Sequence, residues 1–135
     1  MYKKRLLIIN FILSVFIALM CFDVSAEPVK ISVQQAKKMI DAKDYGLVLD
    51  VRTDEEFAGE LGHIEGAKLI PVQELKERVG EIEKYKDKKV LVICHSGNRS
   101  TKASNFLSQK GFSQVFNIVD GMAGWDDQKY PVKRD

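Results

Sequence analysis

Cysteine and histidine are scarce in this sequence, with two residues of each among 135. Cys21 lies in an N-terminal segment that we expect to be removed, which leaves Cys94 as the sole thiol of the mature chain. A chain with one cysteine cannot form an internal disulfide. Cys94 together with His63 and His95 also offers too few ligands for a closed zinc site, so we expect no metal.

The long apolar run of this sequence lies near its N-terminus. Residues 6–20 are almost entirely apolar, follow the basic residues 3–5 and precede the small residues 24–26. This order is typical of a secretory signal peptide, and it predicts that residues 1–26 are removed by cleavage near Ala26. The alternative is a retained membrane anchor, although the run is shorter than the about 20 apolar residues that a span requires. We therefore expect an exported protein, periplasmic after cleavage and without stable membrane association.

The mature sequence also lacks a net charge. Residues 1–26 hold three of the 21 Lys and Arg residues and one of the 19 Asp and Glu residues, so their removal leaves equal numbers of basic and acidic side chains. A balanced chain gives no electrostatic reason to bind nucleic acid or an anionic membrane surface. The remaining length suits a single domain, which we place at residues 27–135, and we expect a monomer.

Apolar runs of strand length alternate with segments of helical spacing along the mature chain. The runs at 47–51 and 90–93 are apolar at successive positions, which is typical of strands covered on both faces of a parallel sheet. The alternation predicts an α/β domain with a mainly parallel sheet. Ligands bind beyond the carboxyl ends of the strands in such sheets, and Asp50 and Cys94 each stand at such an end. The expected strands are 29–31, 47–51, 66–71, 89–93 and 115–118, and the expected helices are 33–40, 54–57, 72–82, 100–110 and a short one after 120.

Residues 94–100, Cys-His-Ser-Gly-Asn-Arg-Ser, join the apolar run 90–93 to the helix expected from about Ser100. The first turn of a helix leaves backbone N–H groups without internal partners, and these can point toward a sulfur. A cysteine so placed has its pKa lowered from about 8.5 toward roughly 3.5–7.5. The pattern favours Cys94 as a nucleophile over a small buried apolar residue, provided that the N–H groups face its sulfur and that the sulfur is not sealed by packed side chains. Ser100 is expected to be the helix N-cap.

A protein-phosphatase loop is an alternative for residues 94–100, because it also follows a strand with a cysteine and closes with an arginine. Four residues separate Cys94 from Arg99 here, one fewer than in those enzymes. The smaller ring of N–H donors is better fitted to a single sulfur than to a tetrahedral phosphate. We therefore expect no phosphatase activity.

Further motifs accompany this loop in a fixed order, and the whole set resembles the rhodanese family, in particular its single-domain exported members. The resemblance covers Ile31 to Tyr130. It implies a five-stranded, mainly parallel sheet flanked by helices on both faces, and a sulfur-transfer activity. The matching residues are Asp50-Val51-Arg52, Glu55-Glu56-Phe57, Gly62-His63-Ile64 with Gly66-Ala67, the loop 94–100, and Asp120-Gly121-Met122-Ala123-Gly124-Trp125.

Carried over residue by residue, the resemblance implies that Cys94 is the catalytic nucleophile. The backbone N–H groups that follow it hold the thiolate and then the persulfide, and Arg99 faces an anionic donor or braces the loop through carbonyl groups. An ion pair between Asp50 and Arg52, and hydrogen bonding by His63, support the loop. The implied substrate-binding residues are His95, Ser96, Gly97, Asn98, Arg99 and Ser100.

The expected function is a sulfurtransferase that works in two steps. The Cys94 thiolate takes the sulfane sulfur of thiosulfate or a related small anion, and the Cys94 persulfide then gives it to cyanide in an assay or to a thiol, including a protein thiol, in the cell. No metal or organic cofactor is required, because the protein supplies the nucleophile and the donors. His95 is only partly charged at neutral pH, which weakens the case for thiosulfate as the natural donor. The alternative is a persulfide carrier or partner-docking module with little turnover of its own.

Overall fold

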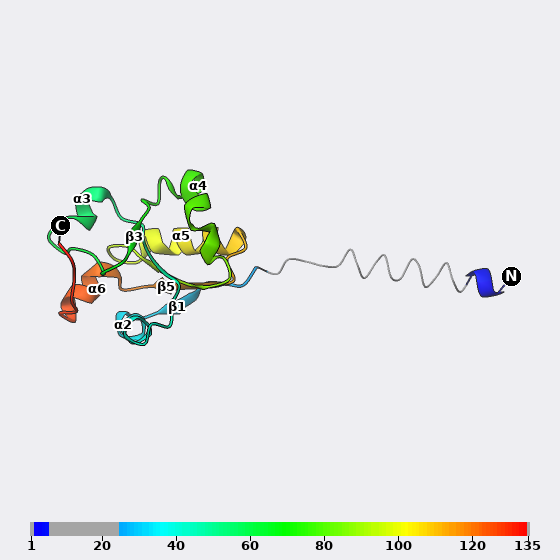
Figure 1. Cartoon of the computed structure of the whole chain (residues 1–135), viewed down its shortest axis with the longest axis horizontal. Helices are drawn as coiled ribbons and strands as arrows, with labels where there is room; N and C mark the ends of the chain where they lie inside the picture. The colour runs from blue at the N-terminus through cyan, green and yellow to red at the C-terminus, as the bar shows by residue number, and fades with distance from the viewer. Residues whose placement is uncertain (1, 6–24, 135) are drawn as a thin grey trace.

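A five-stranded sheet forms the centre of the protein (Figure 1). The computed structural model describes residues 2–5 and 25–134, so most of the predicted signal peptide lies outside the described residues and its cleavage stays a prediction. All neighbouring strands are parallel and follow the order β1-β5-β4-β2-β3, which confirms the predicted α/β class. The strands are β1 (Val29–Ile31), β2 (Leu47–Asp50), β3 (Lys68–Leu69), β4 (Lys89–Ile93) and β5 (Gln114–Ile118).

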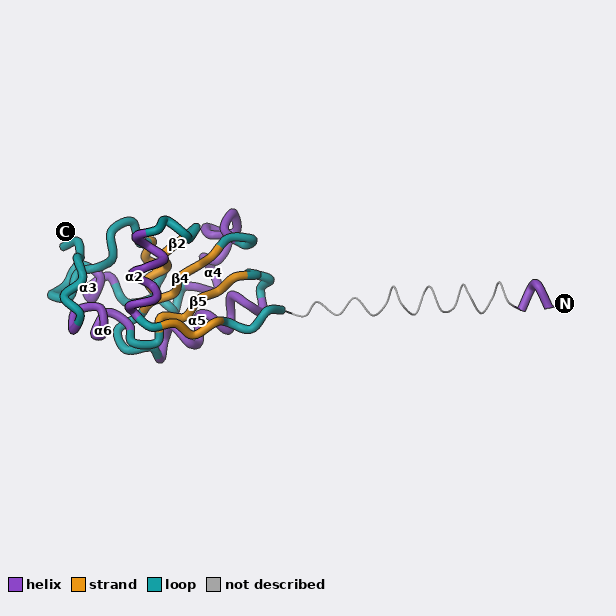
Figure 2. Tube along the Cα trace, turned by 90° about the horizontal axis from the view of Figure 1, so that it is seen from below, coloured by secondary structure: helices purple, strands orange, loops and turns teal. Residues whose placement is uncertain are grey.

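Helices cover both faces of the sheet, with α4 and α5 on one side and α2 on the other (Figures 1 and 2). Strand β4 shows why both faces are covered. Its side chains alternate between faces, so Val90 and Val92 enter one apolar cluster while Leu91 and Ile93 enter the other. Of the helices that the structure describes, none has the length and hydropathy to cross a membrane. The helices are α2 (Val33–Asp41), α3 (Asp54–Phe57), α4 (Leu75–Arg78), the 3-10 helix η1 (Val79–Tyr85), α5 (Asn98–Gln109) and α6 (Gly121–Asp127).

Two of these helices begin with the same local device, a capping box. At α2 the Ser32 hydroxyl accepts from the Gln35 amide at 3.1 Å, and the Gln35 side chain accepts from the Ser32 amide at 2.9 Å. At α3 Thr53 and Glu56 make the same pair of contacts, at 3.2 and 3.0 Å. Each box satisfies two N–H groups that the helix itself leaves unpaired. It also places the Glu56 carboxylate at the start of α3.

Two predicted helices differ from the structure. The stripe at 72–82 is one α-helical turn, α4, continued as η1, because Val79 and Gly80 have low helix propensity and the tighter 3-10 turn serves for such short pieces. Helix α5 begins at Asn98 instead of Ser100, and its N-cap residue is Gly97, which has a φ of 102°. The predicted N-cap role of Ser100 is therefore wrong.

Candidate active site

Cys94 directly follows β4, the central strand, at the carboxyl edge of the sheet. The last residue of β4, Ile93, pairs with Asp50 at the end of β2. The two predicted strand-end residues, Asp50 and Cys94, therefore stand on neighbouring strands at the same edge. This is the edge at which open parallel sheets bind ligands.

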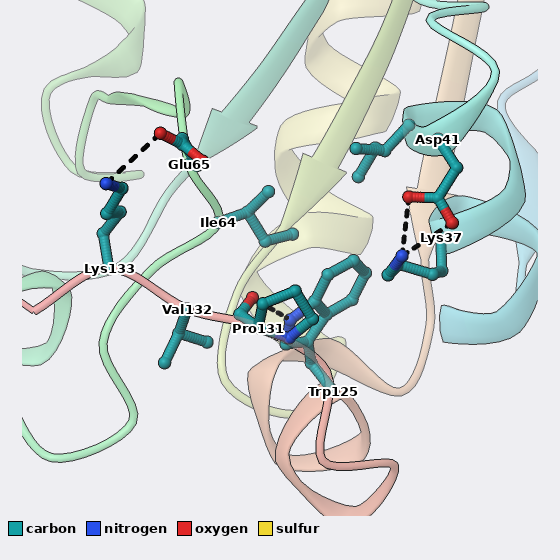
Figure 3. Close-up of a pocket in the computed structure, with 9 residues that line it drawn as sticks. Lys37, Asp41, Ile64, Glu65, Trp125, Pro131, Val132 and Lys133 are labelled. Carbon is teal, nitrogen blue, oxygen red and sulfur yellow. Dashed lines mark hydrogen bonds and ion pairs between the residues drawn. The ribbon is translucent and has the colours of Figure 1, made fainter.

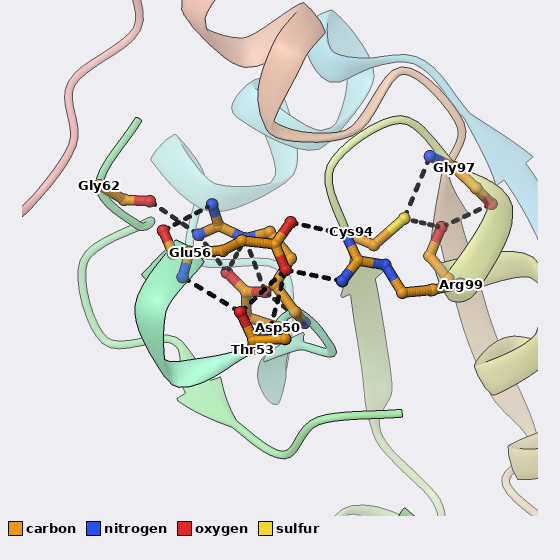
Figure 4. Close-up of polar contacts among 9 residues, drawn as sticks. Asp50, Thr53, Glu56, Gly62, Cys94, Gly97 and Arg99 are labelled. Carbon is orange, nitrogen blue, oxygen red and sulfur yellow. Dashed lines mark hydrogen bonds and ion pairs between the residues drawn. The ribbon is translucent and has the colours of Figure 1, made fainter. Parts of the chain in front are cut away.

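The backbone N–H of Gly97, in the following loop, faces the Cys94 sulfur (Figure 4). The Gly97 amide donates to Sγ at 3.1 Å, and Sγ lies 3.5 Å from the Ser100 hydroxyl. That hydroxyl donates to the Gly97 carbonyl at 3.0 Å, and because a hydroxyl hydrogen rotates it can turn to a thiolate instead. The Ser100 hydroxyl thus contacts both the sulfur and the loop backbone, and these contacts explain why Ser100 is buried in the first turn of α5.

These donors lower the pKa of the Cys94 thiol. Burial on its own raises that pKa, because it penalises the charged form. The Ser100 side chain and the backbone amides of Ser100, Gly97 and Ser96 act in the opposite direction and outweigh it. The net shift is downward, toward a thiolate at neutral pH.

Gly97 both donates a hydrogen bond to the Cys94 sulfur and begins helix α5. Its N–H points to Sγ, while its carbonyl accepts the first α5 bond from the Thr101 amide at 3.0 Å. The φ of 102° that allows both directions is costly for any residue with a Cβ. A Cβ here would also collide with the Val119 carbonyl. The glycine is therefore required by both backbone angle and space.

Helix α6 holds the other side of the loop. The amides of Met122 and Ala123, in its first turn, donate to the carbonyls of Cys94 and His95 at 2.8 and 3.0 Å. Gly121 lies so close to these carbonyls that a Cβ would collide with both. The Gly-rich motif at 120–125 thus fixes the backbone of the nucleophile, a contact that its sequence separation from Cys94 did not reveal.

The sequence analysis required an accessible sulfur at Cys94, and the structure shows it covered. The Cys94 side chain is 0 % exposed and packs in one of the two apolar clusters. The flanking His95, Ser96 and Asn98 are exposed. Of the N–H groups expected to hold the sulfur, those of Gly97, Ser96 and Ser100 act on it. The sulfur is covered in this structure, so a donor reaches it only after the atoms that cover it move.

Asp50 and Arg52 form the predicted ion pair, and both are fully buried. Three hydrogen bonds of 2.8–3.1 Å join their side chains. Arg52 also donates to the carbonyls of Glu56, at 3.1 Å, and Gly62, at 2.7 Å. The pair thus fixes the segment 56–62 across from the cysteine loop, and supports the site from that side.

His63 makes a hydrogen bond at the end of α3, while its implied support of the cysteine loop stays a prediction. Its Nδ1 lies 3.0 Å from the Phe57 carbonyl, and its ring stacks on that of Phe57 with centroids 3.7 Å apart. Both contacts fix the end of α3. The structure therefore gives His63 a place in the same segment that Arg52 holds.

Arg99 has a partner that the sequence analysis missed. Its guanidinium makes two parallel bonds of 2.7 Å to the Glu56 carboxylate, a partner that was neither the anionic donor nor the carbonyl groups expected from the resemblance. The hydrogen bond from Arg99 holds the pKa of Glu56 at about 2, against an opposing effect of burial, with help from Thr53. The T-x-x-E capping box marked Glu56 in the sequence as a helix-start residue. Nothing in the sequence near Glu56 indicated that its partner is Arg99, which is 43 positions away.

A shallow depression adjoins the exposed His95. Glu56 lines it together with two further acids, Glu55 and Glu60, and the buried Arg52. The surface beside His95 is therefore rich in carboxylates, and the guanidinium groups of Arg52 and Arg99 are both paired with acids.

A second depression lies between α2, α6 and the C-terminal segment (Figure 3). The buried Trp125 lines it and donates its Nε1 to the Pro131 carbonyl at 3.1 Å. Trp125 thus packs the last helix and borders this depression. Within residues 2–5 and 25–134, no three His, Cys, Asp or Glu side chains gather so as to hold a metal ion.

Comparisons with known proteins agree with this geometry. The sequence matches the rhodanese-like domain family over residues 32–128. It is 38% identical to the uncharacterized protein YibN of Escherichia coli, over 74% of this chain and 68% of the relative. It is 34% identical to thiosulfate sulfurtransferase 18 of Arabidopsis thaliana, over 78% of this chain and 84% of the relative. It is 36% identical to the putative sulfur carrier protein YrkF of Bacillus subtilis, over 71% of this chain and 50% of the relative.

Solved structures give the same result. A rhodanese-like domain protein from Staphylococcus aureus superposes with a TM-score of 0.66 at 30% identity, covering 78% of this chain and 98% of that one. A rhodanese-related protein from Thermoplasma volcanium also gives 0.66, at 34% identity, covering 81% of this chain and 99% of that one. By its sequence, its sheet order and its cysteine loop, this chain belongs to the rhodanese-like domain family.

Proposed function

We propose that the protein is a sulfurtransferase that carries sulfur as a persulfide on Cys94. The observation that carries the proposal is the Gly97 amide 3.1 Å from Sγ in a loop that lowers the pKa of the thiol. A thiolate is the nucleophilic form of cysteine, and fixed N–H donors stabilise the charge without reorganising during the reaction. The name of the Arabidopsis relative, a thiosulfate sulfurtransferase, supports the same chemistry.

With thiosulfate as donor, the Cys94 thiolate attacks the outer sulfur. The new S–S bond, about 2 Å long, forms as the bond to the sulfonate group breaks and sulfite leaves with the electron pair. The anionic Cys94 persulfide then faces the amides that held the thiolate. Cyanide or a thiolate attacks the outer sulfur in the second step, and the Cys94 thiolate returns. Charge and atoms balance in both steps with no metal or organic cofactor.

Intact-mass spectrometry and a thiocyanate assay test this function. The purified chain, treated with thiosulfate, should gain the mass of one sulfur and produce thiocyanate when cyanide is added. Cys94→Ser should do neither, and when it is prepared as the uncleaved chain it still carries Cys21, so it also reports whether that second thiol contributes. A wild-type protein that gains no sulfur and makes no thiocyanate would contradict the proposal.

A persulfide carrier with little turnover is the second candidate, and the 0 % exposure of Cys94 favours it. One relative is itself named a putative sulfur carrier. A carrier would show stable sulfur loading but negligible thiocyanate formation until a partner thiol is supplied. Comparing the loading rate with the steady-state rate in the same preparation separates the two functions.

We further propose that the protein is exported, is cleaved near Ala26 and acts as a periplasmic monomer on small sulfur compounds or protein thiols. The charged and apolar order of residues 1–26 supports export. Mass spectrometry of protein taken from the exported fraction tests this directly. A chain that begins at Glu27 is expected, and a full-length chain recovered with membranes would contradict it.

A further inference from the structure

The ion pair between Arg99 and Glu56 links the cysteine loop to the facing helix α3. Arg99 is in the first turn of α5, and its two bonds to Glu56 are both 2.7 Å. The two side chains are 28 % and 31 % exposed, so the pair is partly shielded from water. Parallel bonds of this kind fix a guanidinium in one orientation. Figure 4 shows the pair spanning the two elements.

Arg99 is also the loop cation that an anionic donor would meet. The hydrogen bond that Arg99 donates to Glu56 is the main cause that raises the pKa of Arg99, and the charges of Cys94 and Asp50 act in the same direction. Its guanidinium is thus within electrostatic range of the nucleophile. With Glu56 bound to it, however, the pair presents no net charge to an approaching donor.

We propose that Glu56 is a positioning residue that sets the charge preference for sulfur donors by occupying Arg99. This inference rests on the proposed function. A dianionic donor such as thiosulfate must share the guanidinium with the Glu56 carboxylate or displace it. A monoanionic donor meets about half of that repulsion. The wild-type site therefore disfavours dianions relative to monoanionic sulfane donors.

Glu56→Gln is a clean test because the amide preserves the other role of this residue. Glu56 caps α3 through Thr53, and Gln35 performs the same capping with Ser32 at the start of α2. The substitution therefore removes the charge and keeps the helix start. Glu55→Gln is the matched control, because Glu55 is exposed, lies on the same helix and undergoes the same charge change.

The experiment compares two donors that deliver the same sulfur atom. Thiosulfate is a dianion that releases sulfite, and methanethiosulfonate is a monoanion that releases methanesulfinate; cyanide is the acceptor for both. Glu56→Gln should raise the ratio of kcat/KM for thiosulfate to that for methanethiosulfonate by about two- to fivefold, the effect of one partly exposed charge pair. The change should appear in the KM for thiosulfate. Adding Arg99→Gln should abolish the gain, and Glu55→Gln should leave the ratio unchanged.

The outcomes separate this inference from the function on which it rests. An unchanged ratio in Glu56→Gln, or an equal rise in Glu55→Gln, overturns the role of Glu56 while loading of Cys94 still supports the sulfurtransferase. If neither donor places sulfur on Cys94 by intact mass, both proposals are overturned. The wild type offers a measurement that needs no variant, since added salt should lower its KM for thiosulfate or leave it unchanged. A KM that rises steeply with salt would mean that Arg99 already attracts the donor, and it would overturn the inference.

Discussion

Asp50→Asn tests how much the buried ion pair contributes to the stability of the site. Asp50 and Arg52 are 0 % and 1 % exposed and are joined by three side-chain hydrogen bonds. The substitution leaves a buried guanidinium with carbonyl oxygens and one amide oxygen as partners. Breaking a buried pair from one side costs about 3–5 kcal/mol, and because Asn keeps one acceptor we expect about 3 kcal/mol, within a total of roughly 5–15 kcal/mol.

Urea unfolding followed by the fluorescence of Trp125 measures this loss. Trp125 is the only tryptophan of the chain and is 1 % exposed, so its emission reports the loss of the folded core. The unfolding midpoint should fall by about 1–3 M urea. Asp41→Asn is the control, because its pair with Lys37 is exposed and of the i, i+4 type. That substitution should cost only about 0.3–0.5 kcal/mol.

A double variant shows whether the cause is the unpaired charge. Asp50→Leu combined with Arg52→Met removes both charges, so it should recover much of the stability that Asp50→Asn loses. It also keeps the test decisive if Asp50→Asn does not fold. The reasoning is refuted if Asp50→Asn loses no more than Asp41→Asn, or if the double variant is as unstable as Asp50→Asn.

Three other outcomes are expected. Gly97→Ala should cost roughly 1–3 kcal/mol from its left-handed φ alone, and should abolish sulfur loading more completely than it lowers the urea midpoint. In a Cys21→Ser background, the rate of Cys94 alkylation should reach its pH midpoint below that of a free cysteine measured in the same way, and Ser100→Ala should move that midpoint upward. The stability that Glu56 contributes is fully present above its ordinary pKa of 4.5 and is lost as pH falls toward its folded value of about 2. Glu56→Gln should therefore make the urea midpoint less dependent on pH between these values than it is in the wild type.

The sheet could be predicted because its signals are local. The apolar runs at 47–51 and 90–93 require burial on both faces, and this requirement alone favours parallel strands with helices on either side. The cysteine loop was also predictable, because a strand, a glycine and a helix start occur within a few residues of Cys94. The start of α5 was misplaced since Ser is a common N-cap, whereas Gly97 begins the helix through a backbone angle that sequence patterns do not display.

The partner of Arg99 could not be predicted, because the pair depends on how two loops meet across the edge of the sheet. Glu56 is 43 positions from Arg99 and is also a reasonable surface acid of a short helix. Only the packing of α3 against the cysteine loop brings the two together. That packing depends in turn on Arg52 and His63, whose contacts with main-chain carbonyls fix the segment 56–62.

The usual preference for a side-chain N-cap does not hold at the start of α5, where the loop binds the Cys94 sulfur. A helix usually begins with a side-chain cap, but α5 begins with a residue that has none, because the N–H of Gly97 is directed to Sγ and a Cβ would strike Val119. The α6 amides occupy the Cys94 and His95 carbonyls, and Gly121 leaves room for that contact. Each of these two glycines loses more conformational entropy on folding than an alanine would. Without a Cβ, Gly97 can direct its N–H to Sγ while it lies against the Val119 carbonyl, and Gly121 can lie against the carbonyls of Cys94 and His95.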